Sequence, residues 1–257
     1  MEYEGDIAVV QRRVAETSDL HRRRLAMLEA LCVQPGESVL EVGCGGGALL
    51  PALAASVGAS GHVIGIDISP DQIEAANEAC APFKFARAEV QDVNDLPYDD
   101  GSFDAIAAIQ VIEYLDEPRT ALAGLRRVCS NKGRIAILAT NWDTMFWHCD
   151  APELTALIQS AWREHAPFPN LPSELRSMFS NVGFRIAQQT PVTIINNAYH
   201  EDAFAYWIAR LIVAYVTGQG LVSQHDGEQW LAQLQSAQDK GRFFFSSTPI
   251  LTLGMPV

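Results

Sequence analysis

The sequence has little positive charge. It contains 18 Lys and Arg residues against 31 Asp and Glu residues, which gives a formal net charge of −13 at pH 7. A protein that binds the phosphate backbone of a nucleic acid needs a basic face, so we expect no nucleic-acid partner. The one dense basic run, His21-Arg22-Arg23-Arg24, is typical of the exposed face of a helix.

Long apolar runs and paired cysteines are also missing. No run approaches the ~20 apolar residues that cross a bilayer, and the acidic N-terminus has no signal-peptide pattern. We therefore expect a cytoplasmic protein with no membrane partner. The five cysteines are widely spaced and form no Cys-x-x-Cys pair, which argues against a disulfide framework and against a metal site.

Short apolar runs that read as buried strands alternate with helical patterns in the first part of the chain. The expected strands cover residues 38–42, 62–66, 84–86, 103–109 and 133–139. The expected helices between them cover residues 49–57, 72–80 and 118–128. This alternation predicts an α/β fold with a parallel sheet that is covered by helices on both faces.

The pattern loosens after Thr140. Helices are expected at 152–164, 173–181, 201–216 and 228–240, a sixth strand at 183–195 and a last strand at 243–253. Pro249 interrupts the last strand and favours an edge or a bulge there. We predict one domain, divided into an N-terminal helical cap (1–35), a core (36–195), a helical lid (196–241) and a final strand (242–257).

A glycine-rich turn follows the first expected strand directly and precedes a helix. It has the pattern Glu41-x-Gly43-x-Gly45-x-Gly47. Glycines permit positive φ angles and let a ligand approach the backbone at a helix N-terminus. The spacing is neither the G-x-G-x-x-G of dinucleotide binders nor a Walker loop.

Two carboxylates follow at the ends of later strands. Asp67 closes the second strand, where it can accept hydrogen bonds from both hydroxyls of a ribose; the alternative is a helix N-cap, for which Ser69 is better placed. Asp92, with the backbone N–H of Val93, can read an adenine edge. Asp92 alone is as typical of a turn.

These segments resemble a class I S-adenosylmethionine-dependent methyltransferase, most closely the UbiE-like, small-molecule branch (methyltransferase domain 11 type). The resemblance rests on Val39–Gly47, Gly65–Ser69, Asp92–Pro97 and Ser102–Ile106. It covers residues 35–139 in the right order and spacing. It implies a Rossmann-like, seven-stranded, mostly parallel sheet and S-adenosylmethionine as cofactor.

The resemblance also implies a set of cofactor-binding residues. They are Glu41, Gly43, Cys44, Gly45, Gly47, Asp67, Ile68, Gln72, Asp92, Val93 and Gln110. In similar enzymes an N-terminal arginine can pair with a ligand carboxylate, and the sequence does not choose among Arg12, Arg13, Arg22, Arg23 and Arg24; Tyr3 belongs to the same segment. This chain departs from the family at Gln91, where glycine is usual, and at Glu113-Tyr114, where many relatives carry histidine.

The acceptor side is less specific. Aromatic residues that could bind a flat ring or a cation are Trp142, Trp147, Tyr199, Tyr206 and Trp207. The alternative is that the helix around Phe204, Trp207 and Leu211 packs on the sheet. Candidate catalytic residues are His148, His200 and Tyr114, although a histidine without a partner proves little.

The sequence therefore predicts transfer of a methyl group from S-adenosylmethionine to an O, N or C atom of a small molecule. Two alternatives stay open: a non-catalytic protein that binds S-adenosylmethionine, and an enzyme that uses the bound sulfonium to assist another reaction, such as cyclisation. A homodimer is compatible with the sequence, which does not fix the quaternary state.

Overall fold

The computed structural model of the chain describes residues 13–257, which form two compact units. Unit 1 takes its described residues from 13–23, Asn141–Pro169 and Val192–Pro249. Unit 2 comprises Arg24–Thr140, Asn170–Pro191 and Ile250–Val257. The single-domain interpretation, with its lid at 196–241, stays a prediction.

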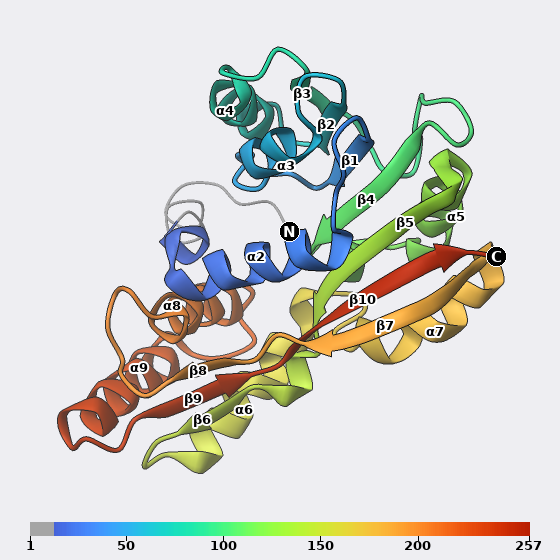
Figure 1. The fold of residues 1–257 in the computed structure, drawn as a ribbon. Helices are drawn as coiled ribbons and strands as arrows, with labels where there is room; N and C mark the ends of the chain where they lie inside the picture. The colour runs from blue at the N-terminus through green and yellow to red at the C-terminus, as the bar shows by residue number, and fades with distance from the viewer. Residues whose placement is uncertain (1–12) are drawn as a thin grey trace. The chain divides into compact units, whose positions relative to one another are not determined.

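Unit 2 is built on a seven-stranded sheet in the order β3-β2-β1-β4-β5-β10-β7 (Figure 1). Its strands are β1 (Ser38–Val42), β2 (His62–Asp67), β3 (Ala86–Val90), β4 (Phe103–Ile109), β5 (Cys129–Thr140), β7 (Phe184–Pro191) and β10 (Pro249–Pro256). The pairs within β3-β2-β1-β4-β5 are parallel, whereas β10 and β7 are antiparallel. The seven-stranded, mostly parallel sheet expected from the sequence is confirmed.

The helices of unit 2 form two packed pairs. They are α3 (Leu50–Val57), α4 (Pro70–Cys80), α5 (Pro118–Val128) and α7 (Leu171–Val182). Helix α3 contacts α4 and strands β1 to β3, while α5 contacts α7 and β5. Covered in this way, strands such as β1 and β4 are buried almost throughout, which explains their nearly continuous apolar sequences.

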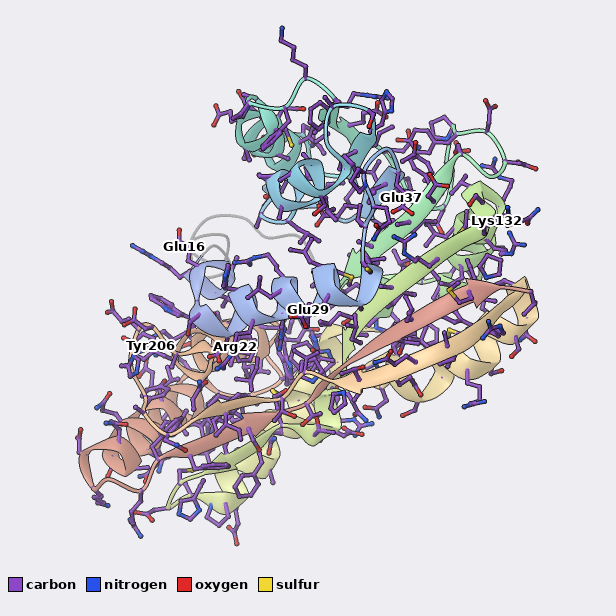
Figure 2. The ribbon with its side chains drawn as sticks, viewed as in Figure 1. Glu16, Arg22, Glu29, Glu37, Lys132 and Tyr206 are labelled. Carbon is purple, nitrogen blue, oxygen red and sulfur yellow. The ribbon has the colours of Figure 1, made fainter. Side chains whose placement is uncertain are left out.

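An ion pair fixes the start of β1 to β5. Arg134 donates to both carboxylate oxygens of Glu37, over 2.9 and 2.7 Å, and also to the carbonyl oxygens of Leu31 and Cys32. Leu31 ends helix α2 (Ser18–Leu31), so one guanidinium ties the end of a helix to two strands. Glu37 is labelled beside β1 in Figure 2.

Unit 1 has a small antiparallel sheet of its own, in the order β6-β9-β8. Its elements are η2 (Trp142–Thr144), β6 (Phe146–His148), α6 (Pro152–Trp162), η3 (Arg163–His165), β8 (Ile194–Asn196), α8 (Phe204–Gly218), α9 (Gln224–Asp239) and β9 (Phe244–Ser247). Trp147 and Trp230 pack together in its core with ring centroids 5.1 Å apart. Within residues 13–257, no helix has both the length and the apolar character that crossing a membrane requires.

Three strand predictions need correction. The third strand lies at Ala86–Val90 and not at 84–86. The predicted strand at 183–195 is two strands, because β7 ends at Pro191 and β8 belongs to the other sheet. The last strand is likewise divided at Pro249, and β10 lies inside the sheet between β5 and β7, so the expected edge position is wrong. Pro249 is tolerated because it is the first residue of β10.

Candidate functional site

The glycine-rich turn connects β1 to α3 in a left-handed path. Gly43, Gly45 and Gly47 have φ angles of 63°, 51° and 78°. A Cβ in this region lies too close to the backbone, which costs about 1–2 kcal/mol, so the conformation alone favours glycine. The turn therefore depends on the three alternating glycines that the sequence singled out.

At two of these glycines neighbouring atoms leave no room for a Cβ, whereas at the third the space is open. A Cβ on Gly43 would lie 2.3 Å from Cγ2 of Val111, and a Cβ on Gly47 would lie 2.8 Å from Cα of Ala76. At Gly45 the nearest atom is Oε1 of Gln72, 3.8 Å away. Of the three glycines, Gly45 therefore has the most open space on the side where a Cβ would lie.

Asp67 joins the turn to the next strand. One carboxylate oxygen accepts the backbone N–H of Gly45 over 3.0 Å, and the other accepts that of Ser69, also over 3.0 Å. Ser69 is the N-cap of α4 and accepts the backbone N–H of Gln72 over 3.4 Å, as the sequence predicted. Asp67 is therefore left at the carboxyl end of β2, where ligands of open α/β sheets bind.

Glu41 supplies a buried carboxyl group beneath the turn. It lies in β1 between Gly65 of β2 and Ala107 of β4. Burial raises its pKa to about 8, an effect that Arg24 opposes and Asp67 reinforces. No described residue donates a hydrogen bond to its buried Oε2 atom. A donor or a positive charge brought by a ligand would stabilise the ionised form here.

The segment after β3 forms a tight turn. Oδ1 of Asp92 accepts from the backbone N–H and the side-chain amide of Asn94, over 2.9 and 3.0 Å. The side chain of Gln91 donates to the carbonyl oxygens of Asp92, over 3.3 Å, and of Asp95. Gln91 thus closes the turn with its side chain where the family has glycine. Asp92 is exposed and Val93 is buried.

Ile68 is unusually exposed for a large apolar residue. Its side chain is 75% exposed immediately after Asp67, and Gln72 is half-buried one turn into α4. A single exposed isoleucine is common on protein surfaces. Its place beside Asp67 nevertheless fits the apolar contact to ribose and adenine that the resemblance implies.

Gln110 directly follows β4 and has a strained backbone conformation. Its φ is 54°, in the left-handed region that non-glycine residues seldom adopt, which costs about 1–3 kcal/mol. Its backbone N–H donates to the carbonyl of Leu138 over 2.8 Å, and its side-chain amide donates to Oγ1 of Thr140 over 3.3 Å. Such strain is common at functional sites, where the surrounding contacts maintain it.

All the predicted cofactor-binding residues lie in unit 2, and most of the predicted acceptor-side residues lie in unit 1. Tyr114, half-buried in η1 (Ile112–Tyr114), belongs to unit 2. His148 and His200 are exposed in unit 1, and Nδ1 of His200 accepts the backbone N–H of Asp202 over 3.1 Å. The catalytic role of these three side chains stays a prediction.

Several of the predicted acceptor-side aromatics are core residues. Trp142, Trp147 and Tyr199 are buried in the hydrophobic core of unit 1. Tyr206 and Trp207 on α8 are only partly buried, and Figure 2 labels Tyr206. The partial exposure of these two side chains makes them the better placed candidates for contact with a small molecule.

The structure separates the arginines that the sequence could not rank. Tyr3 and Arg12 lie outside the described residues. Arg13 and Arg22 form ion pairs with Glu16 and Asp19, and Arg23 lies 4.8 Å above the ring centroid of Phe204. Arg24 belongs to unit 2 and interacts electrostatically with Glu41. Of the four described arginines, Arg24 is therefore the one associated with the turn.

Sequence reasoning missed two polar residues at the carboxyl ends of β4 and β5. Glu113 is buried and accepts the backbone N–H of Thr140 over 3.4 Å, and Thr140 is buried as well. Their position after buried parallel strands could have identified them, because the binding sites of α/β folds lie there. Glu113 was considered only because many relatives have histidine in this region.

Comparisons with known proteins identify the family of the chain. A family model described as "Methyltransferase domain" matches residues 40–137. The chain is 30% identical to "O-methyltransferase rstn1" of Aspergillus nomiae, over 64% of this chain and 71% of that protein. Against two other curated relatives the chain spans just over half of their length, 53% and 58%.

Two solved structures share the fold at low sequence identity. A putative methyltransferase from Bacillus halodurans has a TM-score of 0.65 and 16% identity, covering 91% of this chain and 99% of that one. The [4+2]-cyclase SpnF has a TM-score of 0.60 and 18% identity, covering 92% and 81%. The sheet order, the glycine turn and the curated relatives lead to one conclusion: the chain belongs to the S-adenosylmethionine-dependent methyltransferases.

Proposed function

We propose that the protein transfers a methyl group from S-adenosylmethionine to an oxygen, nitrogen or carbon atom of a small molecule. The observation that carries the proposal is the geometry of the turn: Asp67 accepts the backbone N–H of Gly45, and the strand that leads into the turn carries the buried carboxyl group of Glu41. Oxygen is the first acceptor to test, because one relative is named an O-methyltransferase.

The donor set suits a positively charged nucleoside. Glu41 has a buried oxygen with no hydrogen bond from a described residue, and Asp67 presents a carboxylate at the end of β2. The carboxylate of Asp67, together with the carboxyl group of Glu41 once a cation displaces its proton, favours a cationic ligand over the phosphates of a dinucleotide, which these groups would repel. S-adenosylmethionine supplies an electrophilic methyl group on a positively charged sulfur.

The residues of the chain then have distinct tasks. We assign the ribose hydroxyls to Asp67, the adenine to Asp92, Val93 and the apolar surface of Ile68, and the methionine portion to the glycine turn. Gln110 is assigned a place near the sulfonium. Positioning of the acceptor contributes much of the rate, and an oxygen acceptor also needs a base, for which His148, His200 and Tyr114 are the candidates.

The first experiment is turnover. The purified chain is incubated with S-adenosylmethionine and a panel of phenols, carboxylic acids and amines, and S-adenosylhomocysteine is quantified. We expect its release with at least one acceptor class. Tight binding of S-adenosylmethionine without release under any condition would favour a non-catalytic protein, or one that assists another reaction such as cyclisation.

The ribose assignment has its own test. Asp67→Ala should weaken S-adenosylhomocysteine binding by roughly 1–3 kcal/mol, the range for hydrogen bonds to a charged group. Asp71→Ala is the matched control, because Asp71 is an exposed carboxylate in the first turn of α4. Equal calorimetric affinity of Asp67→Ala and Asp71→Ala would refute the assignment.

We also propose a cytoplasmic site of action and no nucleic-acid partner; the formal net charge of −13 supports the second of these. Fluorescence anisotropy with labelled RNA and DNA checks the second point.

Copies of the chain are proposed to pair as a homodimer, and sedimentation velocity at micromolar concentration distinguishes a dimer from a monomer.

A further inference from the structure

Three polar residues form a hydrogen-bonded set at the carboxyl ends of β4 and β5 in unit 2, through two side chains on one side and the backbone N–H of Thr140 on the other. The side-chain amide nitrogen of Gln110 donates to Oγ1 of Thr140 over 3.3 Å. The backbone N–H of Thr140 donates to Oε1 of Glu113 over 3.4 Å. Thr140 therefore connects a strained glutamine on one side to a buried carboxyl group on the other.

The burial of this set is chemically expensive. Glu113 and Thr140 are both 0% exposed. A carboxyl group is removed from water at high cost unless it is hydrogen-bonded, and a buried threonine hydroxyl also needs a partner. Apolar residues would fill the same positions without these costs, so the polar set has to be explained by something other than packing.

The set is joined to the glycine turn through Val111. Cγ2 of Val111 occupies the space that a Cβ on Gly43 would need, 2.3 Å from that position. Gln110 directly precedes Val111, and its φ of 54° turns the chain away from β4 at this point. The Gln110 side chain is therefore oriented by the hydroxyl of Thr140, and it is attached to the backbone next to the residue that packs against the turn.

We propose that Thr140 and Glu113 are positioning residues for the Gln110 amide, which sets how well the site accepts a positive charge at the sulfur position of the methyl donor. Thr140 holds the amide nitrogen of Gln110, and this fixes the direction of the amide dipole. Glu113 holds the backbone of Thr140 in place. The inference rests on the proposed function, because it assumes that an adenosyl ligand occupies the turn.

Two ligands separate charge from shape. S-adenosylhomocysteine is neutral at sulfur, whereas sinefungin carries an ammonium group where the methyl sulfonium would be. Isothermal titration calorimetry gives the ratio of the two affinities without any acceptor substrate. Thr140→Val removes the hydroxyl at nearly constant volume and should reduce sinefungin affinity by about 3–10-fold, the effect of one lost hydrogen bond. It should change S-adenosylhomocysteine affinity by less than about twofold.

Conservative variants distinguish positioning from general disruption. Thr140→Ser keeps the hydroxyl and should restore the wild-type ratio. Glu113→Gln keeps an acceptor for the Thr140 N–H and should stay close to wild type, whereas Glu113→Leu should shift the ratio as Thr140→Val does. If Glu113→Leu fails to fold, the affinity ratios of Thr140→Val and Thr140→Ser decide whether Thr140 positions the Gln110 amide.

The double variant is the decisive control. In a Gln110→Ala background, Thr140→Val should no longer change the ratio, since its effect passes through the Gln110 amide. An unchanged ratio in Thr140→Val, or an equal shift with and without Gln110, would overturn the inference while leaving the proposed function intact. A wild-type chain that binds neither ligand would overturn both.

Discussion

Glu41 is a buried carboxyl group whose ionisation opposes folding in the absence of ligand. Burial raises its pKa from 4.5 to about 8, Arg24 opposes this shift and Asp67 adds to it. Below about pH 4.5 the group is protonated in both the folded and the unfolded chain. Between about 4.5 and 8 the unfolded chain releases the proton and the folded chain keeps it. The free energy of unfolding therefore falls as pH rises through this window.

Replacing the carboxyl group with an amide should remove this pH dependence. Glu41→Gln should be more stable than wild type without ligand, with a difference of up to about 4 kcal/mol at pH 8 that falls to about 1 kcal/mol or less at pH 5. Thermal melts followed by circular dichroism between pH 5 and 9 give the difference directly. Glu29→Gln is the control, because Glu29 is exposed on α2 (Figure 2). A stability difference between Glu41→Gln and wild type that stays constant across the pH range would contradict the assignment of the raised pKa to Glu41.

At the scale of elements, the β1–α3 turn is set by two separate constraints, conformation and space. Gly43→Ala should lower the free energy of unfolding for two reasons: the left-handed conformation costs about 1–2 kcal/mol with a Cβ, and the new methyl group collides with Val111. Gly220→Ala should lower the free energy of unfolding by the conformational cost alone, because φ is 68° there and no atom lies within 4 Å of the added Cβ. Urea unfolding should show a larger loss for Gly43→Ala, and Val111→Ala should recover part of it. Equal losses for the two glycine variants would exclude the role of Val111.

Much of the sheet could be predicted because the central strands carry a strong signal. β1, β2 and β4 are short apolar runs, and β1 is followed by Gly43 while β2 ends at Asp67. Helix α5 was predicted with the bounds that the structure has, Pro118–Val128. β3 was misplaced because it is an edge strand. Its residues Arg87 and Glu89 pair with each other, over 2.6 Å, and hide the apolar alternation.

The small sheet of unit 1 could not be predicted from local pattern. β6 and β8 have three residues each, which is too few for a periodicity to appear. At the site, the strand ends indicated the turn and Asp67, and the family resemblance added Gln110, without any knowledge of packing. Glu113 and Thr140 needed the three-dimensional arrangement, because their hydrogen bond joins residues 27 positions apart.

At the scale of the whole molecule, the two units contain different natural probes. All five tryptophans, Trp142, Trp147, Trp162, Trp207 and Trp230, belong to unit 1. Buried thiols of unit 2 are Cys44, Cys80 and Cys129, and burial raises the pKa of each. Tryptophan fluorescence therefore reports on unit 1, and protection of these thiols from alkylation reports on unit 2.

The units should unfold together, because two elements belong to both. Helix α2 crosses the boundary between Arg23 and Arg24, and β10 crosses it between Pro249 and Ile250. Loss of either unit would leave part of α2 without its own packing, which favours a single cooperative transition. In a urea titration, tryptophan fluorescence and pulsed alkylation of the three thiols, read by mass spectrometry, should give the same midpoint. Exposed Cys32 should react at every urea concentration and serve as the internal control. Thiol exposure at a lower urea concentration than the fluorescence change would show that unit 2 unfolds independently and that the shared elements do not couple the units.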